Sequence, residues 1–366
     1  MNESEIARYF FHPVCTEEEI DRIFNVQNAS DYLLKLRAET IVDHMRLFRV
    51  YRNKALADPN NWSLEKSFQT THFDRFIKHS SQSVAFDCSN VTYGNMFSND
   101  PNGTIFATEY GPIITISEAL TFFLKFAHLA LLDFDTVVPP HVRMNALRIA
   151  IRVMLKTEAM DFLMDPRGIV PESVGMAIYD PIPLQLEFIA GHEFAHHILG
   201  HLDSGATIKK PIFCTISPSD KDYKPLPVFS QLQKKELDAD RHAILLLEKD
   251  KPHQADVLDA ALLWFGCLEL YEAVSEFMCP SCPWATSSHP TARQRFEQLV
   301  TLSESLGRGK TTLCEQFLQT IDGLKPILLE DVSTNIDIYE IYGSVYLDKP
   351  DSEWRGPKLI DRKDYY

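Results

Sequence analysis

Residues 185–201 read QLEFIAGHEFAHHILGH, and this stretch decides how the rest of the sequence is interpreted. In a helix, His192 and His196 lie one turn apart on one face, where both imidazoles can reach the same Zn²⁺ ion. Glu193 is too close to the pair to be a good ligand, but it is placed to polarise a water on the metal. Apolar residues recur at three- and four-residue spacing, so the helix can be buried and rigid. The alternative is a surface helix that is rich in His, Glu and Ala by chance.

A second stretch, residues 230–248, offers the third ligand that a tetrahedral catalytic Zn²⁺ site with one open position needs. Glu236 and Asp240 are four residues apart and share one face of the expected helix. We expect Glu236 to bind the metal and Asp240 to accept the other ring N–H of a zinc-bound histidine, which would fix its tautomer. Taken alone, the two carboxylates are also typical of an acidic, solvated helix face.

The combination of these segments resembles a known class of enzymes. HEFAHHILGH followed by ELDAD resembles the gluzincin metallopeptidases. The pattern H-E-x-x-H-x-x-x-G-H with a later E-x-x-A-D is similar to the HtpX and CAAX prenyl protease family. A third match, residues 288–295, resembles the H-P-x-x-x-x-R segment of that family and contains His289, Arg293 and Arg295. The matches occur in the family's order and lie within residues 180–300.

The resemblance implies a role for particular residues. It implies that His192, His196 and Glu236 bind Zn²⁺ and that Glu193 is the general base. It also implies that Asp240 supports a ligand and that His289 or a nearby Arg contacts the oxyanion. The best-known members of that family are membrane proteins, whereas this sequence does not look like one, so a soluble relative is expected. The phage-exclusion peptidase Lit, with its own H-E-x-x-H, is a neighbouring candidate. Metzincins fit less well, because their glycine and third histidine would fall at Leu199 and Leu202.

Length and composition are typical of a globular protein. The chain has 366 residues, 45% of them hydrophobic, enough for one large or two ordinary domains. Its net charge of −15 argues against binding to nucleic acids, which needs clustered Lys and Arg. The sequence lacks an apolar run that could span a bilayer and a secretory signal, and its odd number of cysteines, seven, fits reduced thiols. We therefore expect a cytoplasmic protein without stable membrane insertion.

The expected architecture is α+β and mainly α, with a zincin-like fold and a small antiparallel sheet. The predicted divisions are a helical N-terminal lobe at 1–82, a catalytic domain at 83–306 and a C-terminal extension at 307–366. Within the second division, residues 83–89, 103–110 and 112–117 have the composition of short strands bounded by turn residues. An edge strand of such a sheet could pair with an extended substrate.

Helical periodicity accounts for most of the remaining chain. Residues 16–57 are expected to form two helices, the first opened by a capping box at Thr16. The segments 58–82 and 165–184 are expected to be irregular. His128 lies in an apolar helix, so we expect it to pack in the core and not to bind metal.

These features together predict a zinc-dependent endopeptidase of restricted specificity, with one Zn²⁺ per chain and a protein or peptide substrate. The alternative is a zinc-binding regulatory or interaction protein without peptidase activity. Glu193 separates the two, because a closed structural site has no need of a carboxylate beside a water. The long connection 203–229 is expected to border the cleft and restrict access; the alternative is a disordered surface excursion that points away from the cleft. Cys279 and Cys282 form a lone C-x-x-C and are interpreted as reduced loop cysteines, since no second pair completes a zinc site.

Overall fold

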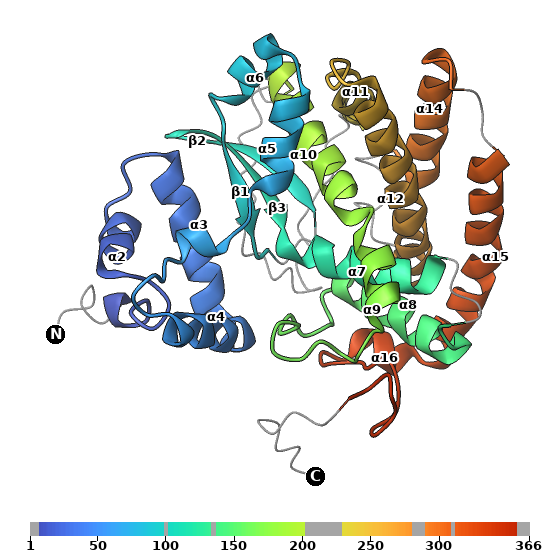
Figure 1. Ribbon diagram of the computed structural model, residues 1–366, viewed down its shortest axis with the longest axis horizontal. Coiled ribbons are helices and arrows are strands. Elements are labelled where there is room, and N and C mark those ends of the chain that lie inside the picture. Colours follow the sequence, from blue (N-terminus) through green and yellow to red (C-terminus); the bar gives the residue numbers. More distant parts are fainter. Residues whose placement is uncertain are drawn as a thin grey trace.

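The computed structural model describes residues 7–98, 102–132, 137–201, 229–279, 290–308 and 312–356. Helices dominate, and one small sheet lies between the N-terminal helices and the rest of the molecule (Figure 1). The expected α+β, mainly α class is therefore confirmed. In chain order the elements are α2 (Glu17–Phe24), α3 (Ala29–Asp43), α4 (Met45–Ala57), η1 (Glu65–Ser67), α5 (Thr71–His79), α6 (Gln82–Cys88), β1 (Thr92–Met96), β2 (Gly103–Thr108), β3 (Gly111–Ser117), α7 (Glu118–Leu131), α8 (Pro140–Met154), α9 (Glu172–Tyr179), α10 (Ile182–Ile198), α11 (Phe229–Leu245), α12 (Lys251–Met278), α14 (Ala292–Ser305), α15 (Thr312–Thr334) and α16 (Ile336–Glu340).

Helices α2, α3 and α4 pack around an apolar cluster of their own, on the left of Figure 1. Thr16 caps α2 as predicted, because its side chain accepts from Glu19 N at 3.2 Å and its own N–H donates to Glu19 Oε2 at 2.9 Å. The segment has three helices and not the expected two, since His44 is extended and separates α3 from α4. Arg37 of α3 is buried and donates to Asn95 O of β1 at 2.7 Å, which joins these helices to the sheet.

The sheet has the strand order β1–β3–β2, with β2 antiparallel and β1 parallel to β3. The prediction of an antiparallel sheet is correct for β2 and β3 but wrong for β1. Residues 83–89, expected as a strand, form most of α6 instead, because Ser81 caps a helix that buries Val84 and Cys88 one turn apart. The first strand therefore begins only at Thr92, and from there it runs in the same direction as β3.

Helix α10 lies at the centre of the molecule, with α5, α11, α12 and β2 packed around it (Figure 1). Gly191 permits the close approach of α5, since a Cβ there would lie 2.5 Å from the ring of Phe76. The expectation that 58–82 and 165–184 are irregular is wrong, because each contains a short helix that buries apolar residues about one turn apart. These residues are Phe73 and Phe76 in α5, and Val174 and Ile178 in α9.

One apolar core extends from Phe73 in α5 to Trp354 near the C-terminus, and it includes residues on both sides of the predicted divisions. His128 is confirmed as a core histidine: it is fully buried, and its Nδ1 lies 2.8 Å from the carbonyl oxygen of Ile178. The chain after α16 is hydrogen-bonded to this core, because Gly343 N donates to the segment that follows α8. The C-terminal part of the described chain is thus part of the same packed body as α10.

The cysteines are only partly as expected. Cys15, Cys88 and Cys267 are buried free thiols. Cys279, at the end of α12, is disulfide-bonded, so the expectation of a reduced cysteine is wrong at this position. Within the ranges that the structure describes, no helix combines the length and low polarity needed to cross a bilayer.

Candidate metal centre

Helix α10 is framed by residues that start and stop helices. It begins after Pro181 and has Pro183 in its first turn, where a missing N–H leaves no hydrogen bond unmade. It ends in a turn at Gly200, whose φ of +67° favours glycine. Between these ends almost every residue up to Ala195 is buried, so the helix is held on most of its surface. His192 and His196 therefore project from a rigid element, as the sequence predicts.

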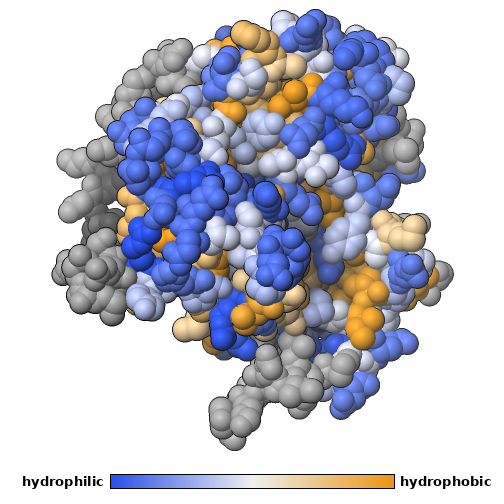
Figure 2. Space-filling view, turned by 60° about the vertical axis from the view of Figure 1, so that its left-hand side comes forward, coloured by the Kyte–Doolittle hydropathy of each residue, from blue (hydrophilic) through white to orange (hydrophobic). Residues whose placement is uncertain are grey.

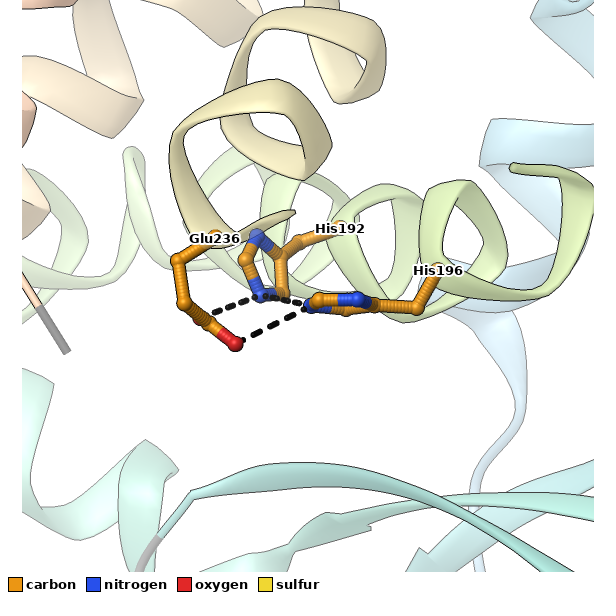
Figure 3. A group of neighbouring side chains, drawn as sticks. All are labelled: His192, His196 and Glu236. Carbon is orange, nitrogen blue, oxygen red and sulfur yellow. Dashed lines mark hydrogen bonds and ion pairs between the residues drawn. The ribbon is translucent and has the colours of Figure 1, made fainter. Parts of the chain in front are cut away.

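Helix α11 brings Glu236 to the two histidines, as Figure 3 shows. Glu236 Oε2 lies 3.3 Å from His192 Nε2, and Glu236 Oε1 lies 3.4 Å from His196 Nε2. The two Nε2 atoms are 3.0 Å apart. A tetrahedral Zn²⁺ with ligands at about 2.0–2.1 Å would hold its ligand atoms about 3.3–3.4 Å from one another. The two distances to Glu236 involve different carboxylate oxygens, but one ligand atom from each of the three residues lies within 4.8 Å of the others, so they can share one metal ion. In the described part of the chain they form the one such group of His, Cys, Asp and Glu.

Figure 2 shows one face of the molecule, whose coloured part is mostly hydrophilic with scattered hydrophobic areas. The candidate metal site is largely shielded from solvent. His192 and Glu193 are buried, whereas the side chains of His196 and Glu236 are 12% and 15% exposed. The side chains of His192, His196 and Glu236 are therefore mostly withdrawn from solvent. Charged groups interact more strongly in the protein interior than in water.

His192 is oriented by a buried carboxylate. Asp240 Oδ1 lies 2.9 Å from His192 Nδ1, so this carboxylate can accept the ring N–H and leave Nε2 free to bind a cation. Asp240 is in turn held by Arg295 of α14, which donates to both carboxylate oxygens at 2.7 and 2.6 Å. Burial alone would raise the pKa of Asp240, but Arg295 holds it below its usual range. Asp240 therefore remains a charged acceptor inside the protein, as its position in the sequence predicts.

Arg295 makes a contact that the sequence alone does not indicate. The sequence placed it only in the H-P-x-x-x-x-R match, with an oxyanion contact as the general suggestion for that segment. In the structure its guanidinium pairs with Asp240 and lies over the ring of Phe265, 4.6 Å from the centroid. Its side chain is 13% exposed. The contact links α14 to the histidine of α10 through α11, so three helices determine the direction of one imidazole.

Glu193 lies on the side of α10 that faces β2. A Cβ at Gly103, the first residue of β2, would come within 3.0 Å of Glu193 Oε1 and 2.7 Å of Ile189 Cγ2. Glycine at this position thus lets the strand pass close to the carboxylate. Burial raises the pKa of Glu193 above its usual value, although the neighbouring histidines oppose the shift. The carboxyl group is therefore tuned towards accepting a proton, beside the ligands and not among them.

The charge balance of the site favours a cation. Burial alone would lower the pKa of His192, yet Asp240 and Glu236 together raise it to about 10. The same two carboxylates that stabilise a proton on this imidazole would stabilise a divalent metal in its place. The donor set of two imidazoles and one carboxylate is one that Zn²⁺ uses in catalytic sites. The residues present therefore fit Zn²⁺ in donor type and charge, and they lie close enough together to share one ion.

One further histidine touches the ligands. His201, directly after Gly200, places its Nδ1 2.9 Å from Nδ1 of His196. Lys235 Nζ donates to the main-chain oxygen of His201 at 3.1 Å. Burial, with the nearby charges of His196 and Lys235, lowers the pKa of His201 to about 4, so this imidazole is neutral near pH 7. The sequence contains the signal for this contact, a Gly-His pair after the second ligand, but no role was assigned to it.

Three of the sequence-based expectations lie outside the described residues. These are His289 as an oxyanion contact, Cys282 as the second cysteine of the C-x-x-C, and the connection 203–229 apart from its last residue, Phe229, which begins α11. The nearest described residues are Pro290 and the start of α14, where Thr291 forms a capping box with Gln294. His192, Glu193, His196, Glu236 and Asp240, by contrast, all lie on described helices and are brought together by α10 and α11.

The fold and the site define a mainly helical α+β protein with a candidate mononuclear metal centre. Comparison with family models, with curated proteins and with solved structures found no match for this chain. The resemblance to gluzincin peptidases thus rests on the residues and their geometry alone.

Proposed function

We propose that this protein is a zinc-dependent endopeptidase of the gluzincin type. The observation that carries the proposal is the convergence of two imidazoles and one carboxylate, with ligand atoms within 4.8 Å of one another, beside a buried carboxylate that is not in this group. His192, His196 and Glu236 would hold the metal, and Glu193 would act as the base. With three protein ligands a fourth position is left for water or substrate, which is typical of catalytic and not of structural zinc.

The chemistry divides between the metal and the chain. When bound, Zn²⁺ would lower the pKa of a water and polarise the carbonyl of the scissile bond. Glu193 would accept the proton of the attacking water and return it to the leaving amine. Its raised pKa suits the second of these transfers, because a carboxyl group that is easily protonated holds the proton until the amine departs. Asp240 and Arg295 would keep His192 in one orientation throughout.

Strand β2 offers a place for an extended substrate. Ser117 N donates to Asn102 O at 3.1 Å, and in an antiparallel ladder such bonded pairs occur at every second residue. The main-chain groups of Gly103 and Ile105 therefore point away from β3, towards an edge that no strand covers in the described ranges. A peptide that pairs with this edge would pass Glu193, because Gly103 lies directly beside that carboxylate. Main-chain pairing of this kind suits cleavage within a chain.

The alternative function is a zinc-binding regulatory or interaction protein. It would use the same three ligands, but it gives no reason for a buried Glu193 beside them. Burying a carboxylate is unfavourable unless it is paired or used, so its retention between the ligands and β2 favours catalysis. This carboxylate is therefore the residue on which a test should act.

The test compares three variants with the wild type. Glu193→Gln keeps all three ligands, so it is expected to retain about one Zn²⁺ per chain and to lose hydrolysis. Glu236→Ala removes a ligand and is expected to lose the metal as well. Asp238→Asn, on the same helix, is the matched control and should keep both. Zinc is measured by mass spectrometry, and substrates are found as new protein N-termini in cells that express wild type but not Glu193→Gln. Full activity in Glu193→Gln would refute the peptidase proposal.

A further inference from the structure

The C-terminal end of α10 has a specific hydrogen-bonding pattern. Gly200 N donates to His197 O at 3.0 Å, and His201 N donates to His196 O at 2.9 Å. These two bonds, with the left-handed conformation of Gly200, form a Schellman motif that closes the helix. In this motif the residue after the glycine folds back over the residue five positions earlier. The local sequence H-x-x-x-G-H therefore places the side chain of His201 against that of His196.

The contact between these two imidazoles joins two nitrogens of the same kind. His196 Nδ1 and His201 Nδ1 are 2.9 Å apart, and a hydrogen bond at this distance needs one N–H and one lone pair. His196 directs its other nitrogen, Nε2, to Glu236 and to His192 Nε2. A nitrogen that binds a metal must offer its lone pair, so the ring proton of His196 must then lie on Nδ1. That assigns the donor to His196 and the acceptor to His201, whose own proton is on Nε2.

We infer that His201 is a positioning residue, which accepts the Nδ1–H of His196 and so holds that imidazole in the tautomer and direction for metal binding. The inference rests on the proposed metal site. It makes the two ligand histidines differ, because His192 is held by a charged carboxylate and His196 by a neutral ring. The proposed ligands His192, His196 and Glu236 and the proposed base Glu193 remain the same.

A second contact keeps this arrangement in place. Lys235 Nζ donates to His201 O at 3.1 Å, and Lys235 directly precedes the third ligand, Glu236. The turn that carries His201 is thereby attached to the helix that carries Glu236. His201 thus lies where the two ligand-bearing helices, α10 and α11, are joined near the metal. A substitution of His201 should therefore alter the geometry of the metal site and not the rest of the fold.

The test replaces His201 in two ways in the full-length protein. His201→Leu removes the acceptor, and it is expected to weaken zinc affinity about 10- to 100-fold, the usual effect of losing such a partner. His201→Asn puts an amide oxygen close to the position of Nδ1, so it is expected to restore most of the affinity. His197→Ala, which removes the adjacent histidine of the same helix, is the control and should bind as the wild type. Affinity for Zn²⁺ alone is measured by competition with a chromophoric chelator.

A nitrogen NMR spectrum of the zinc-loaded wild type gives an independent measurement. The expected result is a proton on Nε2 of His201 and a coupling across the bond between the two Nδ1 atoms. Wild-type affinity in His201→Leu, or a proton found on Nδ1 of His201, would overturn the inference. Equal losses in the Leu and Asn variants would also overturn it, since they would indicate packing and not an acceptor.

These outcomes are distinct from those that test the proposed function. A wild type that binds no Zn²⁺ would remove the metal site and the inference together. A wild type that binds Zn²⁺ but cleaves nothing would refute the peptidase and leave the role of His201 intact. A cleaving enzyme with unchanged affinity in His201→Leu would refute only the role of His201.

Discussion

Asp240→Asn is the substitution whose effects can be worked out furthest from the structure. Asp240 is 0% exposed and pairs with Arg295 through both oxygens. Asparagine has the same shape but no charge, so it leaves the guanidinium of Arg295 without its main counter-ion inside the protein. Removal of one partner of a buried pair typically destabilises a protein by about 3–5 kcal/mol. Burial alone would lower the pKa of Arg295, but Asp240, Glu236 and Glu272 raise it, and the last two remain in the variant. We therefore expect a loss near the lower limit, about 3 kcal/mol.

The same substitution weakens the metal site by a different route. In the wild type Asp240 Oδ1 accepts from both His192 Nδ1 and Arg295 Nη2, and Oδ2 accepts from Arg295 Nε. Asparagine replaces one of these oxygens by an NH₂ group that cannot accept, and its remaining oxygen is neutral and a weaker acceptor. Loss of such support typically lowers metal affinity about 10- to 100-fold, which is about 1.4–2.7 kcal/mol. The two effects separate experimentally, because the first is present in chelator and the second appears only with Zn²⁺.

The assay is urea unfolding of the wild type and Asp240→Asn, with a chelator and with excess Zn²⁺, together with zinc affinity. A double variant, Asp240→Asn with Arg295→Met, removes both charges, so its stability in chelator should exceed that of the single variant. If the unfolding free energy of metal-free Asp240→Asn differed from that of the wild type by less than about 1 kcal/mol, the account of the buried pair would be wrong. Unchanged zinc affinity would show that Asp240 does not orient His192.

Two further predictions concern the strand beside the base and a core histidine. Gly103→Ala places a Cβ 2.7 Å from Ile189 Cγ2 and 3.0 Å from Glu193 Oε1, so kcat should fall by up to about 10²-fold at constant zinc content. The control is Gly175→Ala, whose Cβ meets no atom within 4 Å and which should leave kcat unchanged. Equal kcat in both variants would contradict the contact. Burial lowers the pKa of His128 to about 4, so the unfolded chain binds more protons between about pH 4 and 6.5 and stability is lost as pH falls through that range. Metal-free His128→Gln should show a shallower fall in urea unfolding free energy than the wild type, and an identical slope would refute this assignment.

The ligand residues were predictable because helix geometry is local. Once residues 182–198 are helical, the spacing of His192 and His196 puts both imidazoles on one face, whatever surrounds them. The same periodicity puts Glu236 and Asp240 on one face of α11. Thr16 as the cap of α2 belongs to this group, since a capping box involves four consecutive residues. In each of these cases all the atoms concerned lie within about one helical turn.

The sequence-based predictions of secondary structure are wrong where burial decides between two local structures. Residues 83–89 have apolar and polar residues in an order that suits a strand, yet a helix buries Val84 and Cys88 against the core. Segment 58–82 contains enough polar residues to suggest a loop, but Phe73 and Phe76 find a partner in Phe194 of α10. A short segment has too little propensity of its own to choose, so the choice depends on which surface it meets.

By itself the sequence determined that His192, His196 and Glu193 share a helix, that Glu236 and Asp240 share another, and that both helices have an apolar side. Tertiary structure decided which ends of these helices meet, and it supplied the partners that the sequence did not assign. Arg295 reaches Asp240 from 55 residues away, and Gly103 of strand β2 reaches Glu193 of helix α10. Such contacts depend on how α14 and β2 pack on α10 and α11. Packing is set by the summed burial of many side chains, so no short motif contains it.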